Sequence, residues 1–255
     1  MRVRILGCSG GIGLGLRTTS ILVNNHILID AGTGVGDLTV GELKGIRHVF
    51  LTHSHLDHIA GLPLFLDSVF DDLMEHPITV YARAETITAL REHVFNWVIW
   101  PDFEALPTPE ESMLRFVTLA PGDRTAFEEC TLRAVDVHHS VPSLGYCIER
   151  GDSVFAFSGD TMTNASLWEV LNDYKTVDTL IMEVSFPNQQ AELAEKSGHY
   201  CPATLAADLK NLRHTPDLWV TAMKPGTEDE IFAQVQNAIP ERFIKRLRRG
   251  DVFDL

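Results

Sequence analysis

The sequence has few basic residues, few cysteines and no long apolar segment. It holds 21 lysines and arginines against 35 aspartates and glutamates, a formal net charge of -14, so its long-range field repels nucleic acids and anionic membranes. The four cysteines lack zinc-knuckle spacing, which is typical of a reducing compartment. No apolar run approaches membrane-spanning length, and no apolar signal region follows Met1. We therefore expect a cytoplasmic protein without a membrane partner.

Basic residues gather only near the C-terminus, at Lys245, Arg246, Arg248 and Arg249. Such a run could form a local patch for nucleic acid, but a solvated helix end is the simpler interpretation. Near the N-terminus, residues 7–13 are rich in glycine and follow an apolar segment that is expected to be a strand. A tight turn explains them, although backbone amides in such a loop can also approach an anion.

A chain of 255 residues with 45% hydrophobic content can bury a large core. No low-complexity linker and no repeat of fixed period divides it, so we predict one domain over residues 1–255. Apolar and alternating segments predict an α/β fold. A hairpin is expected around Asn24-Asn25, and the strands of a second sheet are expected at residues 116–119, 130–137, 145–148 and 154–157.

The most informative stretch is Thr52-His53-Ser54-His55-Leu56-Asp57-His58, which follows a short apolar strand. On an extended chain His53 and His55 point to the same side, because side chains alternate with period 2. Where the chain turns helical, Asp57 and His58 can point at a neighbouring position. Imidazoles and carboxylates suit zinc, iron or manganese. A solvated polar turn would account for one histidine, but not for four potential ligands in six positions.

The pattern His-x-His-x-Asp-His after a strand resembles the metallo-β-lactamase superfamily. The resemblance implies an αββα sandwich, with two mixed sheets flanked by helices and a dinuclear metal site at one sheet edge. It also implies a supporting role for Asp30, which would hold the metal-binding loop by hydrogen bonds without being a ligand.

The same resemblance selects further residues. His139, before a polar-proline turn, would be the next ligand, and the neighbouring His138 would point away and be packed or support a ligand. Asp160 in Ser158-Gly159-Asp160-Thr161 would bridge the two ions. The predicted metal set is then completed by four residues of the first motif: His53, His55, Asp57 and His58.

Asp57 and His199 are the predicted catalytic residues. The segment Gly198-His199 resembles one in which a histidine that is not a ligand faces the scissile phosphate, where it would stabilise charge or protonate the leaving oxygen. A histidine that caps a helix is the alternative. Pro202, three residues on, suits a helix start.

The final ligand that the resemblance predicts is missing, because position 222 is alanine between Trp219-Val220-Thr221 and Met223-Lys224-Pro225. The second metal site is therefore weakened. Either the chain has diverged to use one metal or another ligand, or Ala222 is an engineered replacement of histidine. The intact flanking residues favour the engineered change.

Together these motifs resemble the class II cyclic-nucleotide phosphodiesterases, close to ribonuclease Z. The implied activity is hydrolysis of a small 3',5'-cyclic nucleotide by a metal-activated hydroxide, with two divalent ions, zinc expected and iron or manganese possible. Alternatives are ribonuclease Z-like processing of tRNA, a lactonase or thioesterase, and a non-hydrolytic di-iron sensor. The resemblance also predicts a homodimer. The aromatic stretch from Phe95 to Phe103 suits core packing and a substrate-stacking lid or dimer contact equally well.

Overall fold

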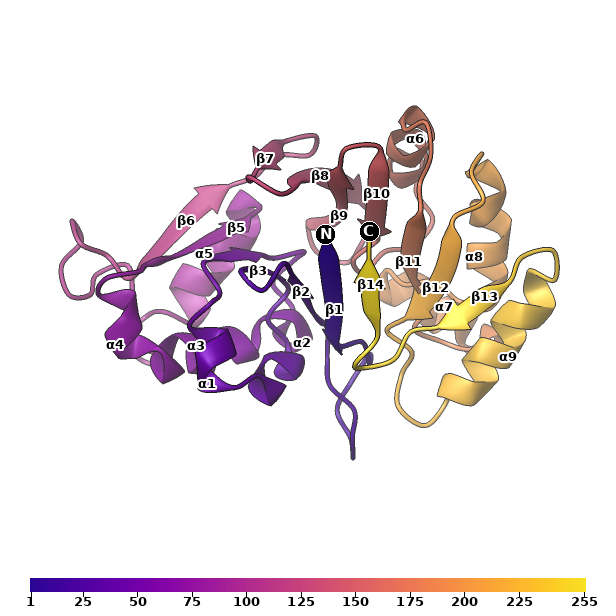
Figure 1. Cartoon of the computed structure of the whole chain (residues 1–255). Coiled ribbons are helices and arrows are strands. Elements are labelled where there is room, and N and C mark those ends of the chain that lie inside the picture. The colour runs from indigo at the N-terminus through magenta and orange to yellow at the C-terminus, as the bar shows by residue number, and fades with distance from the viewer.

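Two seven-stranded β-sheets lie face to face in the computed structural model, which describes all 255 residues (Figure 1). The first sheet begins with the strand at the C-terminus and then follows the N-terminal half of the chain. Its order is β14 (Val252–Asp254), β1 (Arg2–Gly7), β2 (Ser20–Val23), β3 (Ile27–Ile29), β4 (His48–Phe50), β5 (Ile78–Ala82) and β6 (Leu114–Thr118). The N- and C-terminal strands are therefore neighbours.

The second sheet is built from the C-terminal half of the chain. Its order is β13 (Ile244–Arg246), β12 (Asp217–Thr221), β11 (Thr179–Glu183), β10 (Ser153–Phe157), β9 (Ser143–Arg150), β8 (Thr131–Val137) and β7 (Arg124–Ala126). Strands β10 to β13 run parallel to one another, and β7 to β10 are antiparallel. Both sheets are thus mixed, because β3 to β6 are parallel and β14 to β3 antiparallel.

Helices cover the outer faces of both sheets. Beside the first sheet lie η1 (Thr33–Asp37), α1 (Val40–Leu43), α2 (Leu56–Ile59), α3 (Gly61–Ser68), α4 (Phe70–Leu73) and α5 (Ala84–His93). Beside the second lie α6 (Ser166–Asp173), η2 (Asn188–Gln190), α7 (Ala191–Ser197), α8 (Pro202–Asp208), η3 (Leu209–Asn211) and α9 (Glu228–Ala238). The architecture is the predicted αββα sandwich.

The strands are apolar on both faces because both faces are covered. In β2, Ile21 and Val23 belong to the core between the sheets, whereas Leu22 between them packs into the core beneath the first layer of helices. On the other side, Leu180 and Met182 of β11 pack toward the second layer of helices and Ile181 packs between the sheets. Period-2 alternation therefore divides apolar residues between three cores.

Most predicted elements are present, with two corrections. The hairpin at Asn24-Asn25 forms: three residues connect the paired Val23 and Ile27, and both asparagines adopt a positive φ, of 48° and 65°. Residues 116–119, assigned to the second sheet, instead overlap β6 at the edge of the first. Residues 245–249 are not a helix end, since they contain the end of β13 and the turn after it. Neither placement is encoded in the local apolar pattern.

The aromatic stretch divides between two environments. Phe95 and Phe103 are buried and their rings meet edge to face, so they belong to the core. Trp97, Val98 and Ile99 are exposed, with 62%, 85% and 64% of their surface accessible, on a turn that the Asn96 side chain holds. Core packing thus accounts for the two ends of the stretch and leaves the tip unassigned.

Parallel strands bring the polar motifs to one edge. The loops after β4, β10, β11 and β12 all leave the carboxyl ends of their strands, which is where side chains from separate strands of an α/β sheet converge. The glycine loop after β1 joins this edge, since Gly10 N donates to Met223 O and Ala222 N donates to Cys8 O. No helix of the structure is both long and apolar enough to cross a membrane.

Close backbone packing at this edge gives a first prediction. A Cβ added to Gly10 would lie 2.2 Å from the carbonyl oxygen of Ala222, so Gly10→Ala should lower the free energy of unfolding by about 1–3 kcal/mol. Gly36→Ala is the matched control, because a Cβ there meets nothing within 4 Å. Urea denaturation measures both, and equal stability of the two variants would contradict the close approach.

Candidate metal centre

Asp30 anchors the loop that carries the first motif. Its carboxylate is fully buried and accepts hydrogen bonds from Thr52 N at 2.8 Å, from Thr52 Oγ1 at 2.9 Å and from His58 Nδ1 at 2.7 Å. Asp30 itself has φ of 55°, a left-handed conformation that asparagine and aspartate tolerate better than most residues. The carboxylate therefore holds the loop after β4 against the end of β3, the supporting role that the sequence suggested.

The same contacts determine which nitrogen of His53 is free. Because the single hydroxyl proton of Thr52 goes to Asp30, the 2.9 Å contact between Thr52 Oγ1 and His53 Nδ1 requires His53 to donate. His53 Nε2 is then a lone pair, and it is buried without any hydrogen-bond partner. Burial holds the pKa of His53 well below its ordinary value. A buried neutral imidazole whose lone pair meets no protein donor has the chemistry that a metal ligand requires.

His139 and His55 face each other across the same space. His139 Nδ1 donates to the carbonyl of Gly198 at 2.8 Å, which leaves Nε2 as the free nitrogen, 3.1 Å from His55 Nδ1. Burial lowers the pKa of His139 to about 4, and burial also lowers that of His55. Residues 84 positions apart thus present two neutral ring nitrogens to one point.

His58 and Asp160 form the second pair. His58 Nε2 lies 3.3 Å from Asp160 Oδ2, and both residues are buried. Burial alone would lower the pKa of His58, but Asp160 and Asp30 outweigh it and raise that pKa well above its ordinary range. Burial would likewise raise the pKa of Asp160, yet His58 and His53 lower it far below the usual value. Asp160 is therefore ionised among the imidazoles.

His199 approaches from the opposite side and is held by Glu183. His199 Nδ1 lies 2.8 Å from Glu183 Oε1, a completely buried carboxylate at the end of β11, and 3.2 Å from Ser185 Oγ. The rings of His199 and His139 have their centroids 4.8 Å apart. Burial would lower the pKa of His199, but Glu183 and Asp160 outweigh it and raise it. No bond from the ring of His199 caps α8.

Three overlapping groups of ligand atoms result, each with its atoms within 4.8 Å of one another. They are His53–His55–His139, His53–His58–Asp160 and His139–Asp160–His199. Nitrogen donors with one carboxylate suit zinc and neighbouring transition ions, and the hydrogen bonds to Asp30, Thr52 and Gly198 orient the rings as outer partners of metal ligands do. The residues present fit a divalent metal.

Asp57 and His138 lie outside these groups. Asp57 is about one-third exposed, and its Oδ2 is 3.9 Å from His58 Nε2, so it borders the cluster from the side of α2. His138 is exposed and not packed, with its backbone N–H bonded to Thr161 Oγ1. His138 is thus an exposed residue that belongs to none of the candidate ligand groups.

Ala222 occupies a strained backbone position beside the site. It is buried and has φ of 60°, a conformation that alanine adopts rarely. Its carbonyl accepts a hydrogen bond from Ser185 Oγ at 3.0 Å, and Ser185 in turn contacts His199. The backbone geometry of this turn is therefore fixed by neighbouring segments, while its side chain offers no ligand atom.

Glu183 is the functional candidate that sequence reasoning missed. It ends the otherwise apolar run Thr179–Glu183, every residue of which is buried. A carboxylate at the end of a fully buried parallel strand needs a compensating partner, and that requirement is the pattern that could have drawn attention to it. Its partner, His199, lies 16 residues further along the chain.

Comparisons with known proteins agree with this geometry. Residues 25–219 match the family model described as the β-lactamase superfamily domain. A 3',5'-cyclic-nucleotide phosphodiesterase of Aliivibrio fischeri is 29% identical over 252 residues, which cover 81% of this chain and 74% of that protein. A ribonuclease Z of Haloarcula marismortui is 24% identical and covers 93% of this chain and 92% of that protein.

Solved structures share the fold. The crystal structure of unliganded yeast PDE1 superimposes with a TM-score of 0.82, covers 100% of this chain and 99% of that one, and has 19% sequence identity. At that identity the likeness supports the fold alone. The two seven-stranded sheets with their outer helices are thus an architecture already seen in crystals.

Removing the charge of Asp30 should weaken metal binding. We expect Asp30→Asn to lower zinc affinity by about 10- to 100-fold, as loss of an outer partner of a ligand histidine does, because the buried anion that orients His58 is gone. Competition against a chromophoric chelator measures the affinity, with circular dichroism to establish folding. Asp67→Asn, an exposed change on α3, is the control. Unchanged affinity in folded Asp30→Asn would contradict this role.

Proposed function

The chain belongs to the family described as the β-lactamase superfamily domain, and on that premise we propose that it is a metal-dependent phosphodiesterase that hydrolyses a small 3',5'-cyclic nucleotide. Among the observations that support this proposal, the convergence of His53, His55, His139 and Asp160 carries it. These residues come from three separate loops, yet their ligand atoms fall into overlapping groups whose members lie within 4.8 Å of one another, and the buried His53 Nε2 has no protein partner.

His53, His55 and His139, together with Asp160, would hold the first ion, and His58 with Asp160 and Asp57 would hold the second. When bound, such ions supply positive charge that polarises a phosphoryl oxygen and lowers the pKa of water. The residues around them keep the ligands in the required tautomers, because Asp30 accepts a hydrogen bond from His58 Nδ1 and Gly198 O accepts one from His139 Nδ1. Zinc is the proposed ion, with iron and manganese as alternatives.

His199 is the proposed general acid. His199 Nδ1 donates to Glu183, and although burial lowers the pKa of the ring, Glu183 and Asp160 raise it above its ordinary value, which favours a second proton on Nε2. A proton at that atom can be given to the leaving 3'-oxygen of a cyclic nucleotide, which is a poor leaving group unless it is protonated. Thr161 N and Tyr200 N also donate to Glu183, which fixes the carboxylate.

The substrate class is supported by named relatives and by charge. Relatives that share about a quarter of their residues with this chain are named as cyclic-nucleotide phosphodiesterases or as ribonuclease Z. A net charge of -14 disfavours a long polyanion such as tRNA more than a small monoanion. We therefore place the cyclic nucleotide first and RNA second. A homodimer and a cytoplasmic location stay predictions.

A substrate panel tests the proposal. We expect zinc-loaded protein to hydrolyse 3',5'-cAMP and bis(p-nitrophenyl) phosphate but not a lactone.

We also expect Ala222→His to raise the bound metal from about one to about two ions per chain and to increase kcat, because it adds the ligand that the second site lacks. Elemental analysis and initial rates measure the two effects. Ala222→Asn, which tolerates the same backbone conformation, is the control.

Other outcomes of these experiments would contradict the proposed function or favour one of the alternatives. If neither the chain nor Ala222→His turns over any phosphodiester, the proposed function is wrong. Trimming of precursor tRNA with steeply salt-dependent binding would favour the ribonuclease Z alternative. Bound iron with a visible absorption band and no hydrolysis would favour the di-iron sensor. A metal content that Ala222→His leaves unchanged would show that position 222 does not complete a site.

Two substrates whose leaving groups differ in their need for a proton can show whether His199 acts as a general acid or as a metal ligand. We expect His199→Ala to reduce kcat for cAMP by about 10²- to 10⁴-fold but to affect bis(p-nitrophenyl) phosphate much less, because nitrophenolate departs without a proton. Metal content should stay unchanged. Glu183→Gln should show the same pattern in weaker form. Equal losses on both substrates, together with loss of metal, would instead identify His199 as a ligand.

A further inference from the structure

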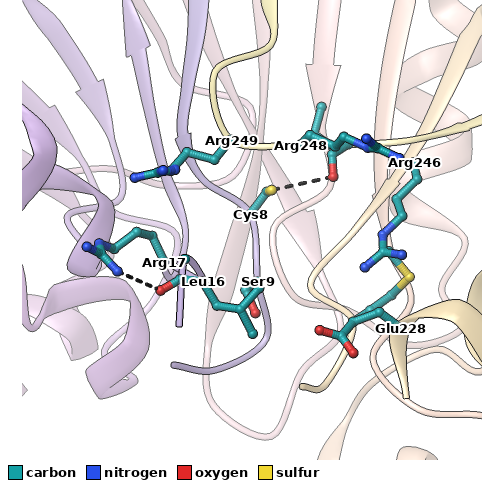
Figure 2. Close-up of a pocket in the computed structure, with 11 residues that line it drawn as sticks. Cys8, Ser9, Leu16, Arg17, Glu228, Arg246, Arg248 and Arg249 are labelled. Atoms are coloured by element: carbon teal, nitrogen blue, oxygen red, sulfur yellow. Dashed lines mark hydrogen bonds between the residues drawn. The ribbon is translucent and has the colours of Figure 1, made fainter. Parts of the chain in front are cut away.

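A pocket of about 300 Å³ lies beside the glycine loop, and none of the candidate metal ligands lines it. Cys8 and Ser9, directly after β1, line it. Its walls include Arg17 and the turn 246–249 that leads from β13 of the second sheet to β14 of the first. Figure 2 shows Arg17 and Arg249 on one side of Cys8 and Arg246 with Glu228 on the other. The basic run of the sequence is therefore gathered around a hollow.

Most donors of the four arginines have no acceptor in the protein. Arg17 Nε donates to Asp37 Oδ1 at 3.2 Å, Arg17 Nη1 to Leu16 O, and Arg249 Nη1 to Asp37 Oδ2. Arg246 Nη1 donates to the exposed Asp229, and no bond of the Arg248 guanidinium is present. Each guanidinium carries five N–H groups, so a ligand that offers several acceptor oxygens can bind without displacing these contacts.

Carboxylates near the pocket balance its charge without filling it. Asp37 is shared between Arg17 and Arg249, and Asp229 pairs with Arg246. Glu228 lines the pocket and accepts from Gly226 N, and Asp251 accepts from Arg248 N. Four cations thus meet four anions locally, in a protein whose overall charge is -14. Attraction of an anion here depends on direct hydrogen bonds and not on a long-range field.

A second observation concerns Ser9. The hydroxyl of Ser9 is buried and has no hydrogen-bond partner in the protein. Buried hydroxyls normally have one, so a residue that lines the pocket has an unpaired hydroxyl that a small rearrangement would have to expose before a ligand could bond to it. The neighbouring Cys8 is not a candidate nucleophile, since burial raises the pKa of its thiol to about 12.

We propose that this pocket binds a phosphate group of a nucleotide-sized ligand. The planar fork of a guanidinium matches two phosphate oxygens at once, and such bidentate, charge-assisted bonds are stronger than neutral ones. A volume of about 300 Å³ is at the lower end of small-molecule sites, which suits a mononucleotide and excludes a folded RNA from entering.

Two sources can supply that phosphate. One is a free ligand that binds apart from the metal centre. The other is a remote phosphate of a substrate whose reacting group lies at the metal centre, because Met223 lines the pocket and Cys8 O accepts from the N–H of Ala222. The second source rests on the proposed function, and the first does not.

Calorimetric titration of the full chain with inorganic pyrophosphate, with a chelator present to keep metal out of the other site, tests the pocket. We expect binding that weakens by about tenfold or more in Arg248→Gln/Arg249→Gln. Arg248→Gln alone should weaken it in part, and it removes no side-chain bond of the folded protein. Arg213→Gln, an exposed arginine after η3, removes the same charge and should leave binding unchanged.

No binding of pyrophosphate by the unaltered chain, or equal binding by the double variant, overturns the proposal whatever the hydrolytic activity proves to be. The two sources are then separated with the metal-loaded protein. If Arg248→Gln raises KM for a 5'-phosphorylated dinucleotide but not for the same dinucleotide without that phosphate, the pocket holds part of the substrate. If neither KM changes while pyrophosphate binding is lost, the pocket holds a separate ligand.

Discussion

The hydrogen bonds of one buried carboxylate, Asp30, determine the geometry of the loop that carries the first motif. Asp30 accepts hydrogen bonds from the backbone N–H and the hydroxyl of Thr52 and from Nδ1 of His58. From those three bonds follow the path of the loop after β4, the tautomer of His58 and, through the Thr52 hydroxyl, the tautomer of His53. A carboxylate that is fully buried needs such partners to offset its desolvation. The cost of burying Asp30 is thus offset by the same contacts that aim two ligands.

Local spacing alone indicated part of the site, the resemblance to a family indicated residues from distant loops, and one residue was indicated by neither. His53, His55 and His58 stand within six positions, so their spacing alone indicated a cluster, and His139 and Asp160 followed from the resemblance. Glu183 was missed because its partner lies on another segment. The sheet assignment of residues 116–119 failed for a related reason: apolar alternation defines a strand but not its neighbours, and pairing with β5 puts that strand in the first sheet. The run 245–249 was wrongly expected to be a solvated helix end, because its basic composition does not show that it contains the end of a strand and the following turn.

At position 222 the backbone conformation and the side-chain chemistry can be considered separately. The backbone there is held from three sides, by Cys8 O, by Ser185 Oγ and by the close approach of Gly10. These contacts require a left-handed conformation whatever the side chain is, and an alanine in that conformation is strained by roughly 1–2 kcal/mol. The strain therefore belongs to the turn and not to the side chain, and that side chain supplies no ligand atom.

The electrostatics of the site argue for bound cations independently of any resemblance. Asp30, Asp160 and Glu183 are all buried within one cluster of histidines. His58 and His53 lower the pKa of Asp160, whereas burial raises the pKa of Asp30 and of Glu183 although each contacts a histidine. A divalent ion between the imidazoles would stabilise their charged forms, and it would also give an acidic protein the local positive field that an anionic substrate needs.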